Sequence, residues 1–337
     1  MNADPLPSGA VGRLDRDQVV QVLRAAVAAP SLHNSQPWRF GTTASSFEVF
    51  ADPERGPRIC DPDDRAVYLA CGAALLNLRL MVSNLGVHPD VRLFPDAADP
   101  SHVASVSCRQ PAHVDPMTRR LVAAIALRHT YRRPMLDSRV PDLLRAALRD
   151  AAREEHAWLV GFPEEQLSQL RTLVGEAHRL QHADPAFVQE WRSWTGRPAG
   201  SPDGVPATAA GPLPEQQDVW VLRDFSGGNG VVRAPGRDFE SDPYLLCVAT
   251  FVEGPHAQVQ AGAALQRVLL RAAADGVTAS FLSQLIEVPS TCRELRRLIG
   301  GALRPQVVLR LGYGGQTPAT ARRPVADVVD FGGPAAG

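Results

Sequence analysis

Residues 29–40, APSLHNSQPWRF, gather polar side chains on a stretch that cannot be one continuous helix. Pro30 ends the helix that precedes it, because proline lacks an N–H and fixes its own backbone. Ser31, Asn34 and Gln36 are therefore expected on a single loop. Since each amide offers both a donor and an acceptor, such a loop can hydrogen-bond the edge of a planar heterocycle. The alternative is a proline-bounded turn with polar capping residues.

A second segment, Arg128-His-Thr-Tyr-Arg132, places two guanidinium groups on either side of the Thr130 hydroxyl. Arginine binds phosphate through paired N–H donors, so this spacing could hold a phosphate group. All 35 basic residues of the chain are arginine, which excludes a phosphate-binding or Schiff-base lysine. Taken alone the cluster is weak evidence, since neighbouring arginines commonly form a solvated surface.

Two segments near the C-terminus add further polar groups. The first, SFLSQ, ends in Ser283 and Gln284. The second, LGYGGQTPATARRP, ends shortly after Arg322 and Arg323. These two arginines could close on an anion, and the alternative is a basic tail.

The elements that must position these segments follow from periodicity and from Gly and Pro. Helices are expected at residues 15–29, 63–86, 143–153, 164–182, 256–275 and 289–299. Strands or extended stretches are expected at residues 47–51, 91–94, 103–108, 156–162, 244–251, 277–284 and 306–311. Residues 184–237 are rich in Gly, Pro, Ser and Ala, and we expect a lid or mobile insertion there.

An internal repeat links two of the expected helices. Residues 69–87 (LACGAALLNLRLMVSNLGV) and 259–277 (VQAGAALQRVLLRAAADGV) align without a gap, with seven identities in nineteen positions. Each copy holds Gly-Ala-Ala, which is small enough for another helix to approach closely. We favour a duplicated unit whose two halves pack against each other through these helices. The alternative is that the two Ala-rich helices are unrelated. The halves are placed at 1–115 and 116–337.

The first segment resembles the Ala-Pro-Ser-x-x-Asn-x-Gln-Pro-Trp signature of the FMN-dependent nitroreductase superfamily. Residues 128–132 resemble its Arg-x-Ser-x-Arg motif, with Thr130 in place of Ser, and the C-terminal segment resembles its Gly-Tyr turn with basic residues. In that family the FMN lies between two subunits. Here each half has the motif that the other lacks. Over nearly the whole chain the sequence is similar to the Acg-like branch, which implies an α+β, single-chain pseudo-dimer with central sheets flanked by helices.

The resemblance implies one FMN, held by Pro30, Ser31, Asn34, Gln36, Arg128, Thr130, Arg132, Ser283, Gln284, Arg322 and Arg323. Arg128 and Thr130 would hold the phosphate, and Arg132 would stabilise negative charge on the reduced ring. The implied reaction passes hydride from NADH or NADPH through flavin N5 to a small-molecule acceptor, nitroaromatic or quinone-like, without a catalytic side chain. The alternative is an FMN store or sensor whose lid covers the flavin, and a third reading is a relic without cofactor.

The composition and net charge of the chain argue against some classes of function. Hydrophobic residues make up 45% of the chain, and the formal net charge is −1. That balance argues against nucleic-acid or membrane binding driven by bulk charge. The five cysteines are scattered and form no Cys-x-x-Cys motif, which argues against a disulfide framework and against a structural zinc site. His178 and His182 are four residues apart but lack a third ligand, so we expect no bound metal. We expect a cytoplasmic monomer, with a weak dimer as the alternative.

Overall fold

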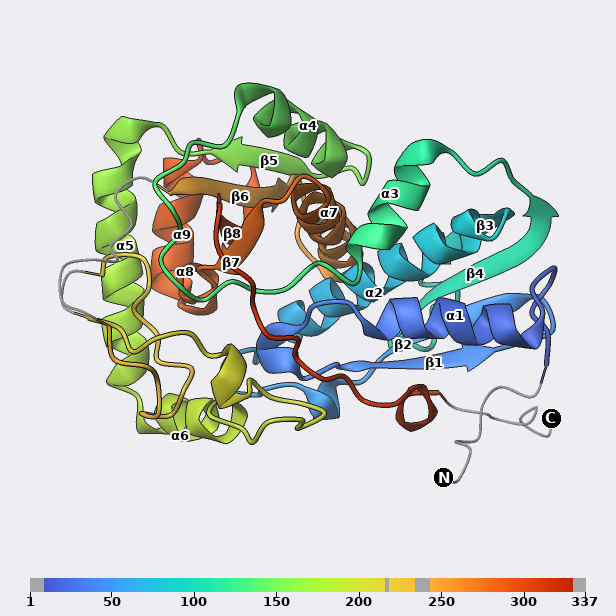
Figure 1. The fold of residues 1–337 in the computed structure, drawn as a ribbon, viewed down its shortest axis with the longest axis horizontal. Coiled ribbons are helices and arrows are strands. Elements are labelled where there is room, and N and C mark those ends of the chain that lie inside the picture. The colour runs from blue at the N-terminus through green and yellow to red at the C-terminus, as the bar shows by residue number, and fades with distance from the viewer. Residues whose placement is uncertain (1–8, 216–217, 234–242, 330–337) are drawn as a thin grey trace.

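A computed structural model describes residues 9–215, 218–233 and 243–329 of the chain. It contains two four-stranded antiparallel sheets, each flanked by helices (Figure 1). The strand order is β1-β2-β4-β3 in one sheet and β5-β6-β8-β7 in the other. Because the second order repeats the first with every strand advanced by four, the two halves share one topology. The expected duplicated α+β fold is confirmed.

The first half follows the expected elements closely. Its helices and strands are α1 (Arg16–Val27), β1 (Trp38–Thr42), β2 (Ser46–Ala51), α2 (Arg65–Asn84), β3 (Val87–Leu93) and β4 (His102–Pro111). The Asp15 carboxylate accepts a hydrogen bond from the Gln18 N–H and so caps α1. Gly86, with φ of +77°, follows α2 in the left-handed conformation that glycine adopts most easily. Trp38 and Phe40 are fully buried in the core of this half.

The second half has the same plan with added helices. Its elements are α3 (Pro116–Ala124), α4 (Asp142–Arg153), β5 (Trp158–Gly161), α5 (Glu164–His182), α6 (Pro185–Trp194), β6 (Tyr244–Thr250), α7 (Pro255–Ala274), β7 (Thr278–Phe281), α8 (Gln284–Glu287), α9 (Pro289–Leu298) and β8 (Arg304–Gly312). Three of these differ from expectation. The helix α3 was not expected, but the Asp115 carboxylate caps it by accepting from the Thr118 N–H. The helix α6 forms inside the Gly/Pro-rich stretch, with Pro185 in its first turn.

The third difference concerns the end of β7. The extended stretch expected at residues 277–284 stops at Phe281, and α8 begins at Gln284. Leu282, Leu285 and Ile286 are all buried, and their spacing of three and four residues suits a helical turn better than a strand. Ser283 therefore stands immediately before α8 rather than at the end of a strand.

The helices α2 and α7 cross at the centre of the molecule and join the halves (Figure 1). A Cβ added to Gly72 would lie 2.0 Å from the Val259 carbonyl oxygen. A Cβ added to Gly262 would lie 2.0 Å from the Leu69 carbonyl oxygen. These two contacts are equivalent under the repeat, so the two helix backbones touch symmetrically. The predicted packing through the repeated helices is confirmed.

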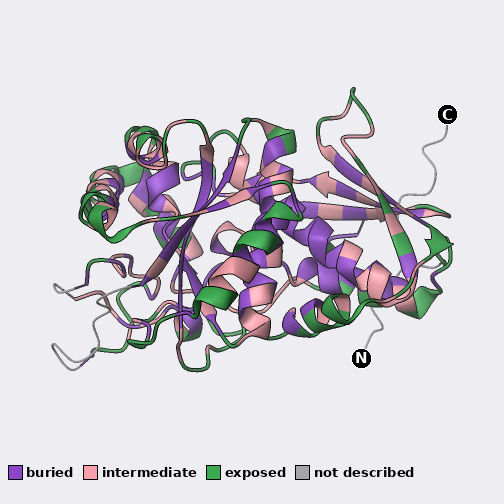
Figure 2. Cartoon of the chain, turned by 90° about the horizontal axis from the view of Figure 1, so that it is seen from above, coloured by how far each residue is buried: buried purple, intermediate pink, exposed green. Residues whose placement is uncertain are grey.

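The apolar character of α2 reflects this central position. By length and composition alone it could cross a membrane, but 72% of its most apolar window is buried inside the protein, as in a core helix. Figure 2 shows the buried residues concentrated along the central helices and the inner faces of the sheets.

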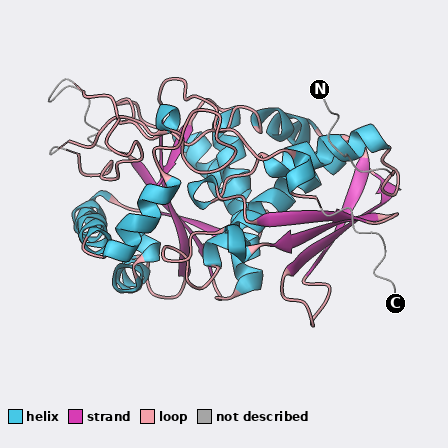
Figure 3. Ribbon diagram, turned by 90° about the horizontal axis from the view of Figure 1, so that it is seen from below, coloured by secondary structure: helices cyan, strands magenta, loops and turns pink. Residues whose placement is uncertain are grey.

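Two segments of the second half reach toward the first. The described part of the insertion between α6 and β6, residues 195–215 and 218–233, consists mostly of loop and lies at one end of the molecule (Figure 1 and Figure 3). The tail after β8 runs back along the first sheet, where the Phe40 N–H donates to the Val328 carbonyl at 2.7 Å. Both segments also contact the loop that follows α1.

Candidate functional site

A cavity of about 560 Å³ lies between the two halves, within the range of small-molecule sites. The halves contribute to its lining as follows: the first half gives Pro30, Ser31 and Asn34, and the second gives Arg128, Thr130, Arg132, Ser283 and Arg322. The two motifs that the sequence divides between the halves thus face one cavity.

The loop after α1 has an unusual backbone. His33, Asn34 and Gln36 have φ values of 51°, 59° and 53°. The left-handed region costs an L-residue about 1–2 kcal/mol. The Ser31 Oγ accepts a hydrogen bond from the Gln36 N–H at 2.9 Å and closes the loop on itself. Strain of this kind persists where the surroundings enforce it, and it clusters at functional sites.

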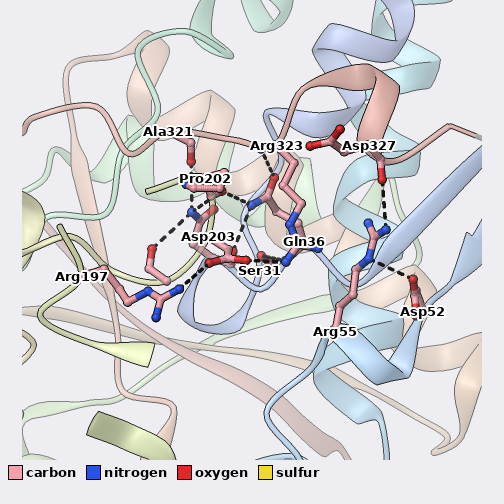
Figure 4. A network of polar contacts seen from close by, with 12 residues as sticks. Ser31, Gln36, Asp52, Arg55, Arg197, Pro202, Asp203, Ala321, Arg323 and Asp327 are labelled. Atoms are coloured by element: carbon pink, nitrogen blue, oxygen red, sulfur yellow. Dashed lines mark hydrogen bonds and ion pairs between the residues drawn. The ribbon is translucent and has the colours of Figure 1, made fainter. Parts of the chain in front are cut away.

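The two amides of this loop hold the insertion and the tail. Asn34 Nδ2 donates to two carbonyls of the insertion and, at 3.0 Å, to the Ala321 carbonyl of the tail. Gln36 is fully buried; its Nε2 donates to the Pro202 carbonyl at 2.6 Å, and its Oε1 accepts from the Arg323 N–H at 2.8 Å (Figure 4). Within the described residues, Asn34 Oδ1 is buried without a partner.

Three arginines line the cavity: Arg128, which is buried, and Arg132 and Arg322, which are half-buried. Burial, together with the neighbouring charges of Arg322 and Arg132, lowers the pKa of Arg128 to about 9. Burial also lowers the pKa of Arg132 and that of Arg322 to about 10. No carboxylate in the described ranges forms an ion pair with any of the three. Such a group of charges suits an anionic ligand.

The remaining contacts of these arginines leave donors free. Arg132 donates to the Ala209 carbonyl at 2.9 Å, and its guanidinium lies 4.7 Å from the centre of the Phe225 ring. The Nε atoms of Arg128 and Arg322 are buried and have no partner among the described residues. A ligand in the cavity would satisfy them.

The segment that carries Arg128 is fixed to the edge of the second sheet. The Tyr131 N–H donates to the Ala279 carbonyl of β7 at 2.8 Å. The Tyr131 ring also packs on the tail at Gly314, where an added Cβ would lie 2.4 Å from the ring. Because only glycine fits there, the tail can pass close to this segment and continue to Arg322.

A further arginine of the cavity, Arg223 of the insertion, is buried and has a carboxylate partner. Arg223 Nη2 contacts Glu287 at 2.5 Å and Gln181 Oε1 at 2.6 Å, and Nη1 donates to the Ser283 Oγ at 2.8 Å. Burial by itself raises the pKa of Glu287, but the charge of Arg223 outweighs it and holds that pKa at about 2. The insertion is therefore held to α8 by an ion pair and to α5 by a hydrogen bond.

His33 is a neutral imidazole in the cavity wall. It is 5% exposed, and burial lowers its pKa to about 3. Its ring meets Trp191 edge-on at 5.0 Å, and its Nε2 has no partner among the described residues. Trp191 itself donates to the Asp224 carbonyl at 3.0 Å, so this tryptophan anchors the insertion.

Eight of the eleven predicted site residues line the cavity, and Gln36, Gln284 and Arg323 do not. Gln284 is buried at the start of α8, and Arg323 forms an ion pair with Asp203 at 2.5 Å. A cofactor contact for each of the eleven stays a prediction. Within the described part of the chain, no three His, Cys, Asp or Glu side chains come together as a metal site.

Among the cavity residues that sequence reasoning missed are His33, Arg223 and Glu287. His33 stands inside the loop motif, between Ser31 and Asn34, so its position in sequence was available as a signal. Arg223 lies in the insertion without periodicity, and nothing in the sequence paired it with Glu287.

Comparisons with known proteins identify relatives along the chain. No family model matches it. It is 32% identical over 329 residues to the Mycobacterium tuberculosis protein named "Putative NAD(P)H nitroreductase Rv3131", covering 94% of this chain and 92% of that one. It is 28% identical to "Putative NAD(P)H nitroreductase acg" of the same organism, covering 93% and 95%. Among solved structures, a Desulfitobacterium hafniense nitroreductase with bound FMN aligns with 64% of this chain and 98% of its own, at 15% identity and a TM-score of 0.41.

Proposed function

Because this chain belongs to the nitroreductase superfamily, we propose that it is an FMN-dependent oxidoreductase that passes hydride from NADH or NADPH to a small acceptor, nitroaromatic or quinone-like. One observation supports this most directly. Three guanidinium groups, one buried and two half-buried, line the same cavity as the loop after α1 and have no carboxylate partner among the described residues. A buried charge is costly unless a counter-charge meets it, which favours an anionic ligand there.

The unpartnered polar atoms fit the chemistry of FMN. Its phosphate would be held by Arg128, Thr130 and Arg322 through charge-assisted hydrogen bonds. Asn34 Oδ1 would accept from a hydroxyl or ring N–H. Arg132 would stabilise negative charge that develops on the ring, because its guanidinium is already fixed by the Ala209 carbonyl. Bound FMN supplies the hydride chemistry itself, so no side chain has to act as nucleophile or acid–base group.

The test is a titration of the FMN-free protein with FMN and with riboflavin, which lacks the phosphate. We expect FMN to bind and to be quenched in fluorescence, and riboflavin to bind about tenfold or more weakly, since it forgoes contacts to two or three arginines. Anaerobic NADH or NADPH should then bleach the yellow absorbance. Equal affinity for FMN and riboflavin would contradict the phosphate assignment, and protein that binds neither would contradict the proposal as a whole.

A second candidate is FMN storage or sensing with little turnover. One observation favours it: the insertion is fastened beside the cavity by Asn34, Gln36 and Arg223. In this case FMN binds in the same titration, but NADH and NADPH leave the colour unchanged over many minutes. Bleaching within seconds favours the enzyme.

A further inference from the structure

The cavity continues past the three unpaired arginines into a second group of cationic residues. Arg65 begins α2, Arg293 and Arg296 belong to α9, and Arg304 begins β8; all four line the cavity, and we call them the cationic arm. Arg293 and Arg296 are three residues apart and so share one face of α9. Three elements from both halves therefore direct arginines into one part of the cavity.

The cationic arm lies apart from the arginine cluster around Arg128. Arg65 donates to the main-chain oxygen of Gln306 in β8. Four residues farther along this strand, Arg310 is the register partner of Ser280 in β7. Four strand residues span roughly 13 Å. The segment with Arg128 is bonded to β7, so the Arg128 cluster lies at that far end of the cavity. An anion bound by the Arg128 cluster therefore does not supply a counter-charge to the cationic arm.

Arg65 stands at a position where a cation is unfavourable. It is the first residue of α2, whose N-terminus already carries partial positive charge, and the first turn contains no acidic residue. Its guanidinium donates to the Gln306 carbonyl at 2.5 Å. The nearby Asp61 carboxylate accepts instead from the N–H groups of Ala66 and Val67. No carboxylate in the described ranges forms an ion pair with Arg65.

The rest of the arm is only partly neutralised. Arg304 pairs with Glu253 at 3.4 Å. Arg296 Nε donates to the Gly301 carbonyl at 2.9 Å, and Arg293 is exposed. Neither Arg293 nor Arg296 has an ion-pair partner among the described residues. Of the four guanidinium groups, only that of Arg304 is ion-paired, and the carboxylate nearest to Arg65, that of Asp61, accepts from backbone N–H groups. The remaining positive charge raises the local concentration of anions.

We propose that the cationic arm binds an anionic group, a carboxylate or a phosphate, on the substrate that enters this cavity; this rests on the proposed oxidoreductase function. Guanidinium groups hold such oxygens through short, paired hydrogen bonds. The group could belong to the acceptor, as a carboxylate, or to the nicotinamide donor, as a phosphate. A neutral substrate of the same shape leaves the arm unpaired and binds more weakly.

The test uses calorimetric titration without a reductant, at low ionic strength, on protein with and without FMN. The probes are 4-nitrobenzoate, its neutral analogue 4-nitrobenzamide, and 2′,5′-ADP. The variants are Arg65→Gln, Arg293→Gln and the control Arg297→Gln. Arg297 is exposed on the same helix as Arg293 but does not line the cavity. Since Arg293 is exposed, its replacement tests the arm even where Arg65→Gln fails to fold.

We expect wild type to bind 4-nitrobenzoate about tenfold more tightly than 4-nitrobenzamide, as one good charge-assisted contact provides. The preference should fall to about twofold or less in Arg293→Gln and Arg65→Gln, and persist in Arg297→Gln. Competition by 2′,5′-ADP assigns the arm to the donor phosphate, and no competition assigns it to an acceptor carboxylate. Equal binding of the two nitro compounds by wild type, or an unchanged preference in both arm variants, overturns the proposal. Loss of FMN binding with the anion preference intact would count against the oxidoreductase proposal alone.

Discussion

Replacing Arg128 by Met is expected to change two properties in opposite directions: the FMN-free protein becomes more stable, and FMN binds more weakly. Burial, together with the charges of Arg322 and Arg132, lowers the Arg128 pKa from the ordinary arginine value to about 9. At about 1.36 kcal/mol per pH unit, keeping this group charged costs the folded protein up to about 5 kcal/mol. Because the pKa is lower in the folded state, the whole cost is present below pH 9 and disappears as the pH rises toward the ordinary pKa of arginine. At neutral pH it therefore acts in full.

Methionine has a similar length and removes the charge while retaining much of the packing. Replacing buried charges by apolar groups of similar size stabilises proteins by about 1–4 kcal/mol, and we expect a gain in that range without FMN. The FMN phosphate then loses at least one charge-assisted hydrogen bond of about 1.5–3 kcal/mol. This corresponds to a rise in Kd of about ten- to a hundredfold.

Urea unfolding of the FMN-free protein measures the first effect, and fluorescence titration with FMN measures the second. The control is Arg133→Met, in the same segment but exposed and outside the cavity lining, which should change neither quantity. Riboflavin affinity should also stay the same in Arg128→Met. A variant that is less stable without FMN and binds FMN as wild type does would show that Arg128 is a structural residue and that our reasoning is wrong.

Three further variants test the halves, the cavity wall and the loop. Gly72→Ala should destabilise the protein by about 3 kcal/mol, because its Cβ would lie 2.0 Å from the Val259 carbonyl. Gly175→Ala, with nothing within 4 Å, should stabilise it by about 0.5–1 kcal/mol, and a lower urea midpoint for both would reject this explanation. The free energy of unfolding of the wild type should fall as the pH falls from 6.5 toward 3, because the His33 pKa is about 3 in the folded protein. In His33→Asn, urea unfolding across this range should show a pH dependence that is weaker by up to about 1.4 kcal/mol per pH unit. Gln36→Asn keeps an amide that tolerates positive φ but shortens its reach, so dilution experiments should show FMN leaving about tenfold faster; an unchanged rate would mean that this amide does not hold the insertion closed.

The fold could be predicted from sequence where the signal was local. Gly72 and Gly262 stand at equivalent positions of two similar helices, and close helix approach requires small residues at the crossing. The repeat therefore predicted both the duplication and the surface that joins the halves. The motif containing Arg128 and the loop containing Asn34 could be assigned to one cavity because each half held only one of them.

The contacts that could not be predicted from the sequence join segments that are far apart in the chain. Gln36 carries the expected amide, but its partners are Pro202 and Arg323, which lie in the insertion and the tail. No periodic pattern links those segments to the loop, so the sequence could not show that this amide faces away from the cavity. The pairing of Arg223 with Glu287 is hidden for the same reason, since it joins an aperiodic segment to a four-residue helix.

The Asn34 amide would link the binding of FMN to the closure of the insertion, because its nitrogen and its oxygen are used differently. Asn34 Nδ2 holds the insertion and the tail, while its Oδ1 is left without a partner among the described residues. A ligand that bonds to Oδ1 would fix the amide and so strengthen the same contacts that hold the insertion. By linkage, a closed insertion would raise FMN affinity to the same degree. An enzyme and a store would then share one site and differ in how often these hydrogen bonds break, so the rate of FMN release from wild type should follow the opening of the insertion rather than the loss of phosphate contacts alone.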